Sequence, residues 1–247
     1  MVRAFTVNRL PVTVGASATE IGRLVADRFA EVVTERLASE PTVSVIIATG
    51  NSQLPFVTAL AEHRLQWDRI RVFHMDEYLG MAADHPASFR KWLRDRIVVP
   101  FAPLEFFGLN GDADSVEDEI TRYTGLLKQY PPILTVMGIG ENGHLAFNDP
   151  PAEFDTPESV HVVELDEVCR LQQVGEGHFP SLAETPARAL SLTVPALLRS
   201  DRVLVMVPEK RKASAVKAAL EGPLTPHNPA SILPTVGNAE LFLDTDS

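Results

Sequence analysis

An apolar run at residues 133–137 leads directly into a segment that contains Gly138, Gly140 and Gly143. A short continuous apolar run of this kind is typical of a strand that is buried on both faces, as in a parallel sheet. Glycines at the carboxyl end of such a strand let the backbone turn sharply and approach a ligand closely. We therefore expect an α/β fold with a ligand site at the end of this strand.

Strands and helices alternate along the rest of the chain. Apolar runs predict the strands, and apolar side chains at helical spacing predict the helices between them. The expected strands are residues 43–47, 70–74, 133–137, 159–164, 189–193, 203–207 and 241–243, and the expected helices are residues 17–38, 55–63, 88–96, 115–128 and 210–220. This alternation predicts one domain over residues 1–247, with a doubly wound, mostly parallel, Rossmann-like sheet and helices on both faces.

The three glycines also match the G-x-G-x-x-G fingerprint of dinucleotide-binding folds. Glu164 and Asp166 even follow at about the expected distance, roughly 20 residues downstream. That fingerprint requires a helix that crosses back over the sheet, within a connection of about a dozen residues. Pro150 and Pro151 end any helix soon after the last glycine. We therefore expect no dinucleotide cofactor.

Side chains suited to acid–base chemistry follow the same glycines. The segment supplies an amide at Asn142, an imidazole at His144 and a carboxylate at Asp149. An imidazole beside a carboxylate, at the mouth of a parallel sheet, can transfer protons, with its tautomer fixed by Asn142 or by Asp149. The alternative is a histidine whose polar atoms are satisfied by the backbone of a tight turn.

Two further loops end neighbouring strands of the expected sheet. Residues 49–52 offer consecutive backbone N–H groups and two hydroxyls that suit a phosphate, or they form a plain turn. They are Thr49, Gly50, Asn51 and Ser52. Asp76 and Glu77 follow strand 70–74, where Asp76 could act as a general base, or where the pair lies on a solvated turn.

Basic residues are scarce, and three of them stand together at the start of the last expected helix. Cations are unfavourable near a helix N-terminus, so Lys212 in this group has a reason to serve a phosphate pocket. The alternative is a solvated helix start.

Composition narrows the partners and the compartment. The net charge of −11 argues against nucleic acid, because phosphate backbones need a basic surface. No apolar run is long enough to cross a bilayer, and residues 1–10 lack the apolar stretch of a signal peptide. The single cysteine, Cys169, fits a reducing compartment, so we expect a cytoplasmic protein. No H-x-x-x-H or C-x-x-C spacing predicts a metal, although His74, Asp76, Glu77 and His144 could meet in space.

Nearly the whole chain resembles the glucosamine-6-phosphate deaminase (isomerase) family, which is related to 6-phosphogluconolactonase. The stretch M-D-E-Y at residues 75–78, then D-H-P-A-S at 84–88 and G-H-L-A-F-N at 143–148, carries the resemblance. Phe147 and Asn148 followed by an acid are similar to the deaminase branch rather than the lactonase branch. Further matching segments are residues 49–52, 109–111, 138–150 and 212–222.

The resemblance implies that the chain converts glucosamine 6-phosphate to fructose 6-phosphate and ammonia without a cofactor or metal. It implies that Asp76 moves a proton between C2 and C1 of the sugar. His144 would assist ring opening, with Asn142 and Asp149 as its supports. The phosphate would be held by Thr49, Gly50, Asn51, Ser52, Gln173 and Lys212.

Four positions depart from the family pattern. The family usually has aspartate at Asn142, glutamate at Asp149, arginine near Gln173 and proline at Gln53. An amide at residue 142 can accept the imidazole N–H but cannot stabilise an imidazolium as a carboxylate does. Aspartate reaches one methylene less far, so contact between Asp149 and His144 requires a shift of the backbone. Asn142→Asp, which restores the usual residue, is expected to keep or raise activity.

Three functions remain open on these grounds. The first is deamination of glucosamine 6-phosphate or of its galacto epimer. The second is a 6-phosphogluconolactonase or a related sugar-phosphate isomerase, and the third is a sugar-phosphate-binding homologue that no longer turns over. Each predicts a small-molecule sugar phosphate as partner rather than nucleic acid or a membrane. Assembly into a homo-oligomer also stays open.

Overall fold

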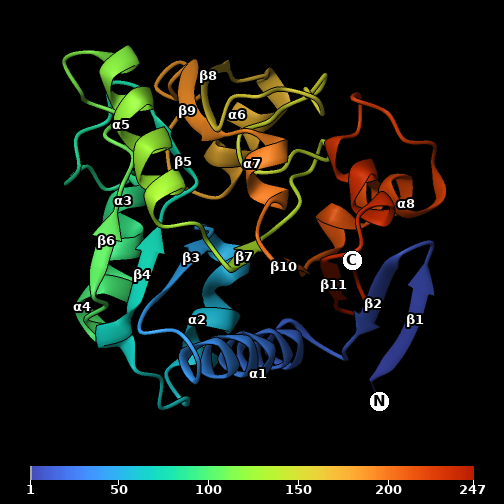
Figure 1. Cartoon of the computed structure of the whole chain (residues 1–247). Coiled ribbons are helices and arrows are strands. Elements are labelled where there is room, and N and C mark those ends of the chain that lie inside the picture. Colours follow the sequence, from blue (N-terminus) through green and yellow to red (C-terminus); the bar gives the residue numbers. More distant parts are fainter. Residues whose placement is uncertain (1) are drawn as a thin grey trace.

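The main sheet of the molecule has eight strands in the order β1-β2-β11-β10-β7-β3-β4-β6 (Figure 1). The structure is a computed structural model that describes residues 2–247, so Met1 of the predicted domain lies outside the described part. The strands are β1 (Arg3–Val7), β2 (Leu10–Val14), β3 (Val43–Ile47), β4 (Ile70–Phe73), β6 (Glu105–Phe107), β7 (Leu134–Met137), β10 (Arg202–Val207) and β11 (Ala239–Leu243). All neighbours are parallel except the hairpin of β1 and β2, which confirms the mostly parallel sheet.

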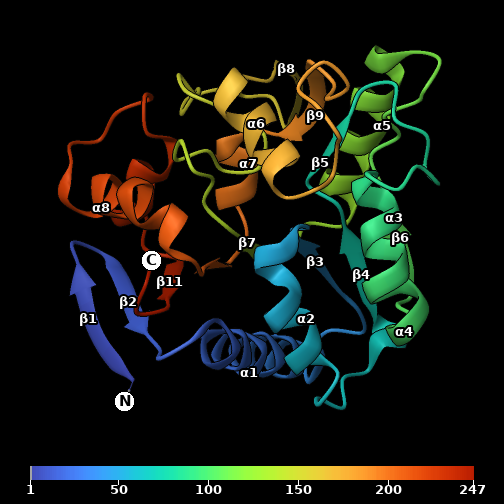
Figure 2. The same ribbon diagram turned by 180° about the vertical axis from the view of Figure 1, so that it is seen from behind.

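Helices cover both faces of this sheet (Figures 1 and 2). Along β10, Val203 and Val205 enter one apolar core, while Leu204 and Met206 enter the other. A strand that is apolar on both sides must be covered on both sides. The helices α1 (Ala18–Leu37) and α2 (Leu54–Leu60) pack on the second core, and α5 (Val116–Gln129), α7 (Val194–Leu198) and α8 (Ala213–Glu221) pack on the first. The expected doubly wound arrangement is confirmed.

A second, three-stranded antiparallel sheet lies beyond the carboxyl ends of β3 and β4 (Figure 1). It consists of β5 (Asp76–Tyr78), β9 (Arg188–Leu192) and β8 (Val160–Glu164). The expectation that strands 159–164 and 189–193 join the main sheet is wrong. Val162 and Glu164 of β8 are exposed, and such one-sided burial is typical of antiparallel sheets.

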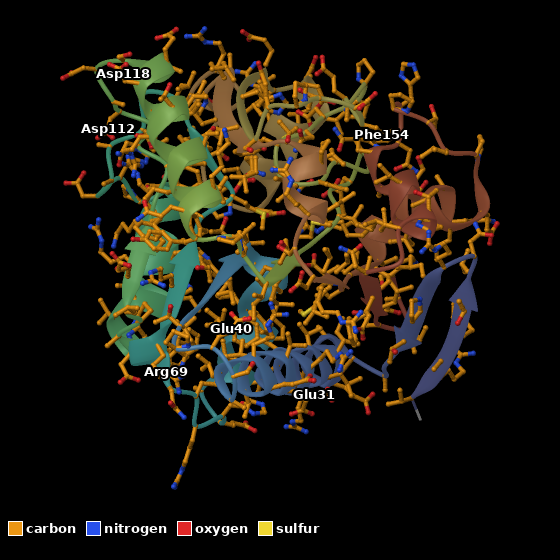
Figure 3. The ribbon with its side chains drawn as sticks, in the orientation of Figure 1. Glu31, Glu40, Arg69, Asp112, Asp118 and Phe154 are labelled. Carbon is orange, nitrogen blue, oxygen red and sulfur yellow. The ribbon has the colours of Figure 1, made fainter. Side chains whose placement is uncertain are left out.

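The remaining elements extend or add to those expected. The helix predicted at 88–96 begins as α3 (Phe89–Leu93) and continues through a π-helical turn (Arg94–Val98) into α4 (Val99–Phe101). The helix α6 (Glu167–Gly175), which lies beside the small sheet, is not among the predicted elements. Glu31 of α1 and Asp118 of α5 lie at the outside of the molecule, where acidic side chains are solvated (Figure 3). Within residues 2–247, no helix combines the length and apolarity needed to cross a membrane.

Candidate active site

A cleft opens where the main sheet changes direction. From β3 the chain proceeds to β4 and β6 on one side, whereas β7 leads to β10 and β11 on the other. Connections that diverge from two neighbouring parallel strands leave a crevice at their carboxyl ends, which is where ligands bind in such folds. The cleft brings together most of the residues predicted for the site: Thr49, Gly50, Ser52, Asp76, His144, Gln173 and Lys212.

Asp76 is a carboxylate in the cleft wall that has little contact with water. It begins β5, is only 6% exposed, and its Oδ1 is buried without a hydrogen-bond partner among the described residues. Burial raises the pKa of Asp76 to about 8, and the nearby charge of Glu77 adds to the rise. A carboxylate that lacks both solvent and donors is a stronger proton acceptor than an ordinary aspartate.

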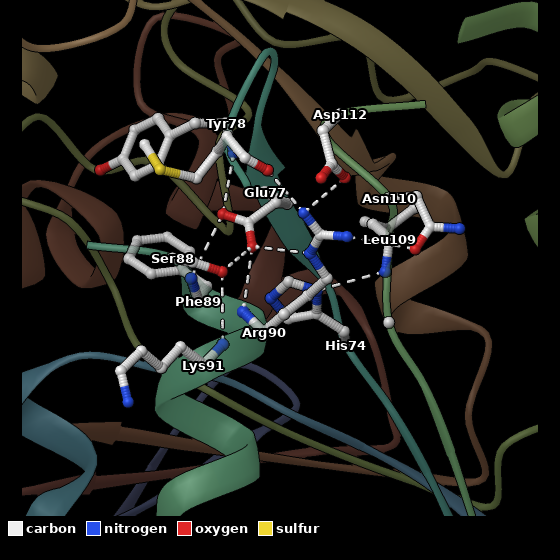
Figure 4. A network of polar contacts seen from close by, with 12 residues as sticks. His74, Glu77, Tyr78, Ser88, Phe89, Arg90, Lys91, Leu109, Asn110 and Asp112 are labelled. Atoms are coloured by element: carbon white, nitrogen blue, oxygen red, sulfur yellow. Dashed lines mark hydrogen bonds and ion pairs between the residues drawn. The ribbon is translucent and has the colours of Figure 1, made fainter. Parts of the chain in front are cut away.

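Glu77, the next residue, ties this strand to helix α3 (Figure 4). Its fully buried carboxylate accepts hydrogen bonds from the Ser88 hydroxyl at 2.7 Å and from the N–H groups of Tyr78, Phe89 and Arg90 at 3.0–3.2 Å. Burial raises the pKa of Glu77, and these donors together with the Arg90 guanidinium oppose that rise. The network therefore fixes Phe89, which lines the cleft, against the strand that carries Asp76.

His144 and Asp149 form a hydrogen-bonded pair at the base of the cleft. Nδ1 of His144 lies 3.0 Å from Oδ1 of Asp149. The backbone is left-handed at Gly143 (φ 87°), just before His144, and at Ala146 (φ 51°), between the two partners. With this turn, the shorter aspartate does reach the imidazole. Although burial acts to raise it, the hydrogen bonds from His144 and Asn142 hold the pKa of Asp149 below its usual value.

The imidazole lies directly over Gly140. A Cβ added at Gly140 would come within 2.2 Å of Nε2 of His144, so only glycine fits beneath the ring. Because Nδ1 is held by Asp149, Nε2 of His144 is the ring nitrogen left to serve a ligand.

Asn142 supports the pair from behind and does not touch the ring. Its Oδ1 accepts the backbone N–H of His144 at 3.0 Å, and its Nδ2 donates to Asp149 at 3.0 Å and to Asp166 at 2.8 Å. Of the two residues expected to fix the tautomer, Asp149 and not Asn142 contacts the ring. Asp166 also donates its backbone N–H to Asp149. As the N-cap of α6, its side chain accepts the backbone N–H of Cys169.

The loop after β3 (residues 49–52) and the turn after β10 (Lys210–Lys212) both contribute residues to the cleft. Gly50 adopts φ 100° and leads into a short 3-10 turn, Asn51–Gln53. Lys212 ends the turn Lys210–Lys212 and is buried, which lowers its pKa. Its ammonium group makes no ion pair or hydrogen bond with the rest of chain 2–247.

Asn51 differs from the other loop residues predicted to bind phosphate. It is exposed, it does not line the cleft, and its Nδ2 donates at 3.4 Å to the backbone oxygen of Glu176. The Asn51 side chain is thus turned toward α6, so it is not a cleft residue in this structure.

Helix α6 supplies a wall of the cleft that the sequence pattern does not indicate. Gln173 of α6 is buried and accepts the Tyr78 hydroxyl at 2.9 Å. Val168 and Leu171 are 50% and 48% exposed, so the apolar periodicity of this helix does not mark its buried face. The polar side chains of the cleft that were not predicted to bind ligand are Gln53, Gln172, Glu176 and His178.

One group of side chains among residues 2–247 has the composition of a metal site. Ligand atoms of His144, Asp149 and Cys169 lie within 4.8 Å of one another. Burial raises the pKa of the Cys169 thiol, and the nearby charges of Asp149 and Asp166 add to the rise. Asp149 is already engaged by His144, Asn142 and the backbone N–H of Asp166, so we assign no metal to the group.

Comparisons with known proteins agree with this geometry. Residues 16–242 match the family model of glucosamine-6-phosphate isomerases/6-phosphogluconolactonase. Proteins named glucosamine-6-phosphate deaminase from Streptococcus pneumoniae and Listeria innocua are 29% and 28% identical over 217 residues, which covers 88% of this chain and 90% and 91% of theirs.

Solved structures extend the likeness to the fold. A monomeric glucosamine-6-phosphate deaminase matches with a TM-score of 0.86 at 29% identity, over 95% of this chain and 97% of its own. A 6-phosphogluconolactonase from Thermotoga maritima matches with a TM-score of 0.77 at 18% identity, over 95% and 99% of the two chains.

Proposed function

Because the chain belongs to the glucosamine-6-phosphate isomerase/6-phosphogluconolactonase family, we propose that it converts glucosamine 6-phosphate to fructose 6-phosphate and ammonia. The observation that carries this proposal is the presence, in one cleft, of a buried carboxylate and a histidine held by a second carboxylate. The buried carboxylate is Asp76, whose Oδ1 has no hydrogen-bond partner within residues 2–247. The first suits proton transfer at carbon, and the second suits ring opening.

Ring opening is the step that fits His144. With Asp149 accepting from Nδ1, the neutral imidazole presents Nε2 as a base. Nε2 takes the proton of the C1 hydroxyl and returns it to the ring oxygen, which gives an open-chain aldehyde at C1. Asp149 stabilises the imidazolium that exists between the two transfers.

Isomerisation and loss of the amine follow at Asp76. The ionised carboxylate removes the C2 proton, which the C1 aldehyde acidifies, and the enol that results receives a proton at C1. The C2–N bond becomes an iminium, to which water adds, and ammonia leaves to give the C2 ketone. One water is consumed, and no redox change occurs.

The phosphate end of the substrate is assigned to the loop after β3 and to Lys212. Backbone N–H groups of a tight glycine turn, together with the hydroxyls of Thr49 and Ser52, suit an anion. Lys212 is buried and lines the same cleft, and its ammonium has no partner in the described part of the chain, which supports the assignment. Gln173 replaces a charged donor with a neutral amide, so we expect weaker phosphate binding than an arginine would give.

A cytoplasmic enzyme that acts on a small metabolite is also part of this proposal. The net charge of −11 disfavours binding to nucleic acid, and the one cysteine, Cys169, is a buried free thiol.

Product analysis tests the proposal. Purified protein is incubated separately with glucosamine 6-phosphate, galactosamine 6-phosphate and 6-phosphogluconolactone, and ammonia, ketose phosphate and acid are measured. We expect ammonia and fructose 6-phosphate in equal amounts from the first substrate. Acid from the lactone without ammonia from either amino sugar would select the lactonase alternative. Phosphate-ester binding without any product would select a non-catalytic homologue.

A further inference from the structure

Glu176 is a carboxylate in the cleft wall that the proposed reaction does not use. It follows the last turn of α6 as the C-cap, where an acidic side chain is unfavourable because the helix dipole is negative there. Its side chain is nevertheless only 9% exposed and faces the cleft. Nearby donors or cations must therefore stabilise the carboxylate charge of Glu176.

Cationic and polar donors surround this carboxylate. Oε1 of Glu176 lies 2.9 Å from Nη2 of Arg211 and accepts from Nε2 of Gln172 at 2.9 Å, and Oε2 lies 3.4 Å from Nε2 of His178. Although burial acts to raise it, these partners hold the pKa of Glu176 at about 2. Glu176 is therefore an anion throughout the working pH range.

The phosphate-binding elements adjoin this anion. Lys212 lines the same cleft, and its charge and that of Glu176 each favour the ionised form of the other. The backbone oxygen of Glu176 accepts the long contact from Asn51, in the loop after β3. Guanidinium, ammonium and imidazole groups beside a glycine turn are the donors that a phosphate prefers.

We propose that Glu176 holds its negative charge beside Arg211 and Lys212, where the phosphate of a ligand would bind. By this charge it lowers, and thereby sets, the affinity for phosphate esters. This inference rests on the proposed function, because it takes the cleft to bind a sugar phosphate. A dianionic phosphate near Lys212 meets the charge of Glu176, so binding must either displace the carboxylate or tolerate the repulsion. Removing that charge, while keeping the side-chain shape, should strengthen binding.

The test is calorimetric titration of inorganic phosphate into the wild type, Glu176→Gln and Glu209→Gln. Glu209 is the matched control, because it also pairs with Arg211, at 2.5 Å, but does not line the cleft. We expect Glu176→Gln to bind phosphate about tenfold more tightly, roughly the effect of one partly screened charge. Glu209→Gln should stay within about twofold of the wild type, and the tenfold gain should shrink at high ionic strength.

Ammonia release from glucosamine 6-phosphate is measured on the same samples. Equal or weaker phosphate binding by Glu176→Gln overturns the inference, even where ammonia release supports the proposed function. If Glu176→Gln binds phosphate more tightly but neither the wild type nor the variants release ammonia, the inference is supported and the proposed function is overturned. Glu176→Ala is titrated in parallel, and a gain there too assigns the effect to the lost charge rather than to a contact of the glutamine.

Discussion

The surroundings of two carboxyl groups at the site, Asp76 and Asp149, shift their pKa values in opposite directions. Asp76 has no donor to Oδ1 from the residues that the structure describes, and its pKa is raised to about 8. Asp149 accepts from an imidazole and an amide and has a lowered pKa. Two carboxyl groups of the same chemistry thus serve two purposes, one as a proton acceptor and one as a fixed anion.

The raised pKa of Asp76 predicts the pH dependence of turnover. The base must be ionised, so kcat/KM for glucosamine 6-phosphate should rise with pH and level off above about pH 8. Initial rates at low substrate concentration between pH 5.5 and 9.5 measure this. A plateau already reached at pH 6 would show that the free enzyme holds Asp76 ionised, against this account.

Asn142→Asp is a second test at this scale, and the geometry reverses the expectation drawn from the family pattern. Nδ2 of Asn142 donates to both Asp149 and Asp166, so an aspartate would place a third carboxylate against two others. We expect kcat to fall about tenfold at pH 8, and the ratio to wild type to improve at lower pH, where the cluster takes up a proton.

The double variant Asn142→Asp/Asp166→Asn restores one amide and two carboxylates. It should recover part of the lost activity, whereas purely additive losses would mean that residues 142 and 166 do not interact. Wild-type activity in Asn142→Asp at pH 8 would contradict the assigned contacts.

At the scale of elements, the sequence indicates those parts that are apolar on both faces. The central strands β3, β7 and β10 read as continuous apolar runs, and their predicted positions agree with the structure within a residue or two. Strands 159–164 and 189–193 were predicted, but their separate antiparallel sheet was not, and only β8 shows the one-sided burial that would indicate it. Helix α6 was not predicted because Gln173 is buried while Leu171 is half exposed. Glu176 and Asp166 were missed as site residues for this reason, since both flank α6.

The glycine segment after β7 must leave room for the His144 ring, and this requirement can be tested at Gly140. Gly140→Ala would drive a Cβ into the His144 ring, and a displacement of about 1 Å can cost about a hundredfold in rate. We expect kcat to fall by that order while the melting temperature changes little.

Gly125→Ala is the control for this variant, because it lies in α5 with open space at its Cβ. It should leave kcat unchanged and stabilise the fold by roughly 0.5–1 kcal/mol. Unchanged kcat in Gly140→Ala would mean that the imidazole does not rest on this glycine.

For the whole molecule, the fold decides where the site lies but not which reaction occurs there. A deaminase at 29% identity and a lactonase at 18% both match the chain over 95% of its length. The switch in direction between β3 and β7 places the cleft, whereas alternation in the sequence predicted only that a site lies at the carboxyl ends of the strands. The choice between reactions rests on side chains that the chain brings together from four strand ends. Among them, Phe147 and Asn148 followed by Asp149 resemble the deaminase branch, and Asp76 supplies the base that the proposed deamination needs.

The most direct test of Asp76 as the proton-transfer base is the kcat of ammonia release by Asp76→Asn, compared with wild type at pH 8. We predict a loss of at least about a thousandfold, with binding of inorganic phosphate unchanged, because the amide keeps the shape but cannot accept the C2 proton. A kcat within tenfold of wild type would contradict this role and with it the proposed mechanism.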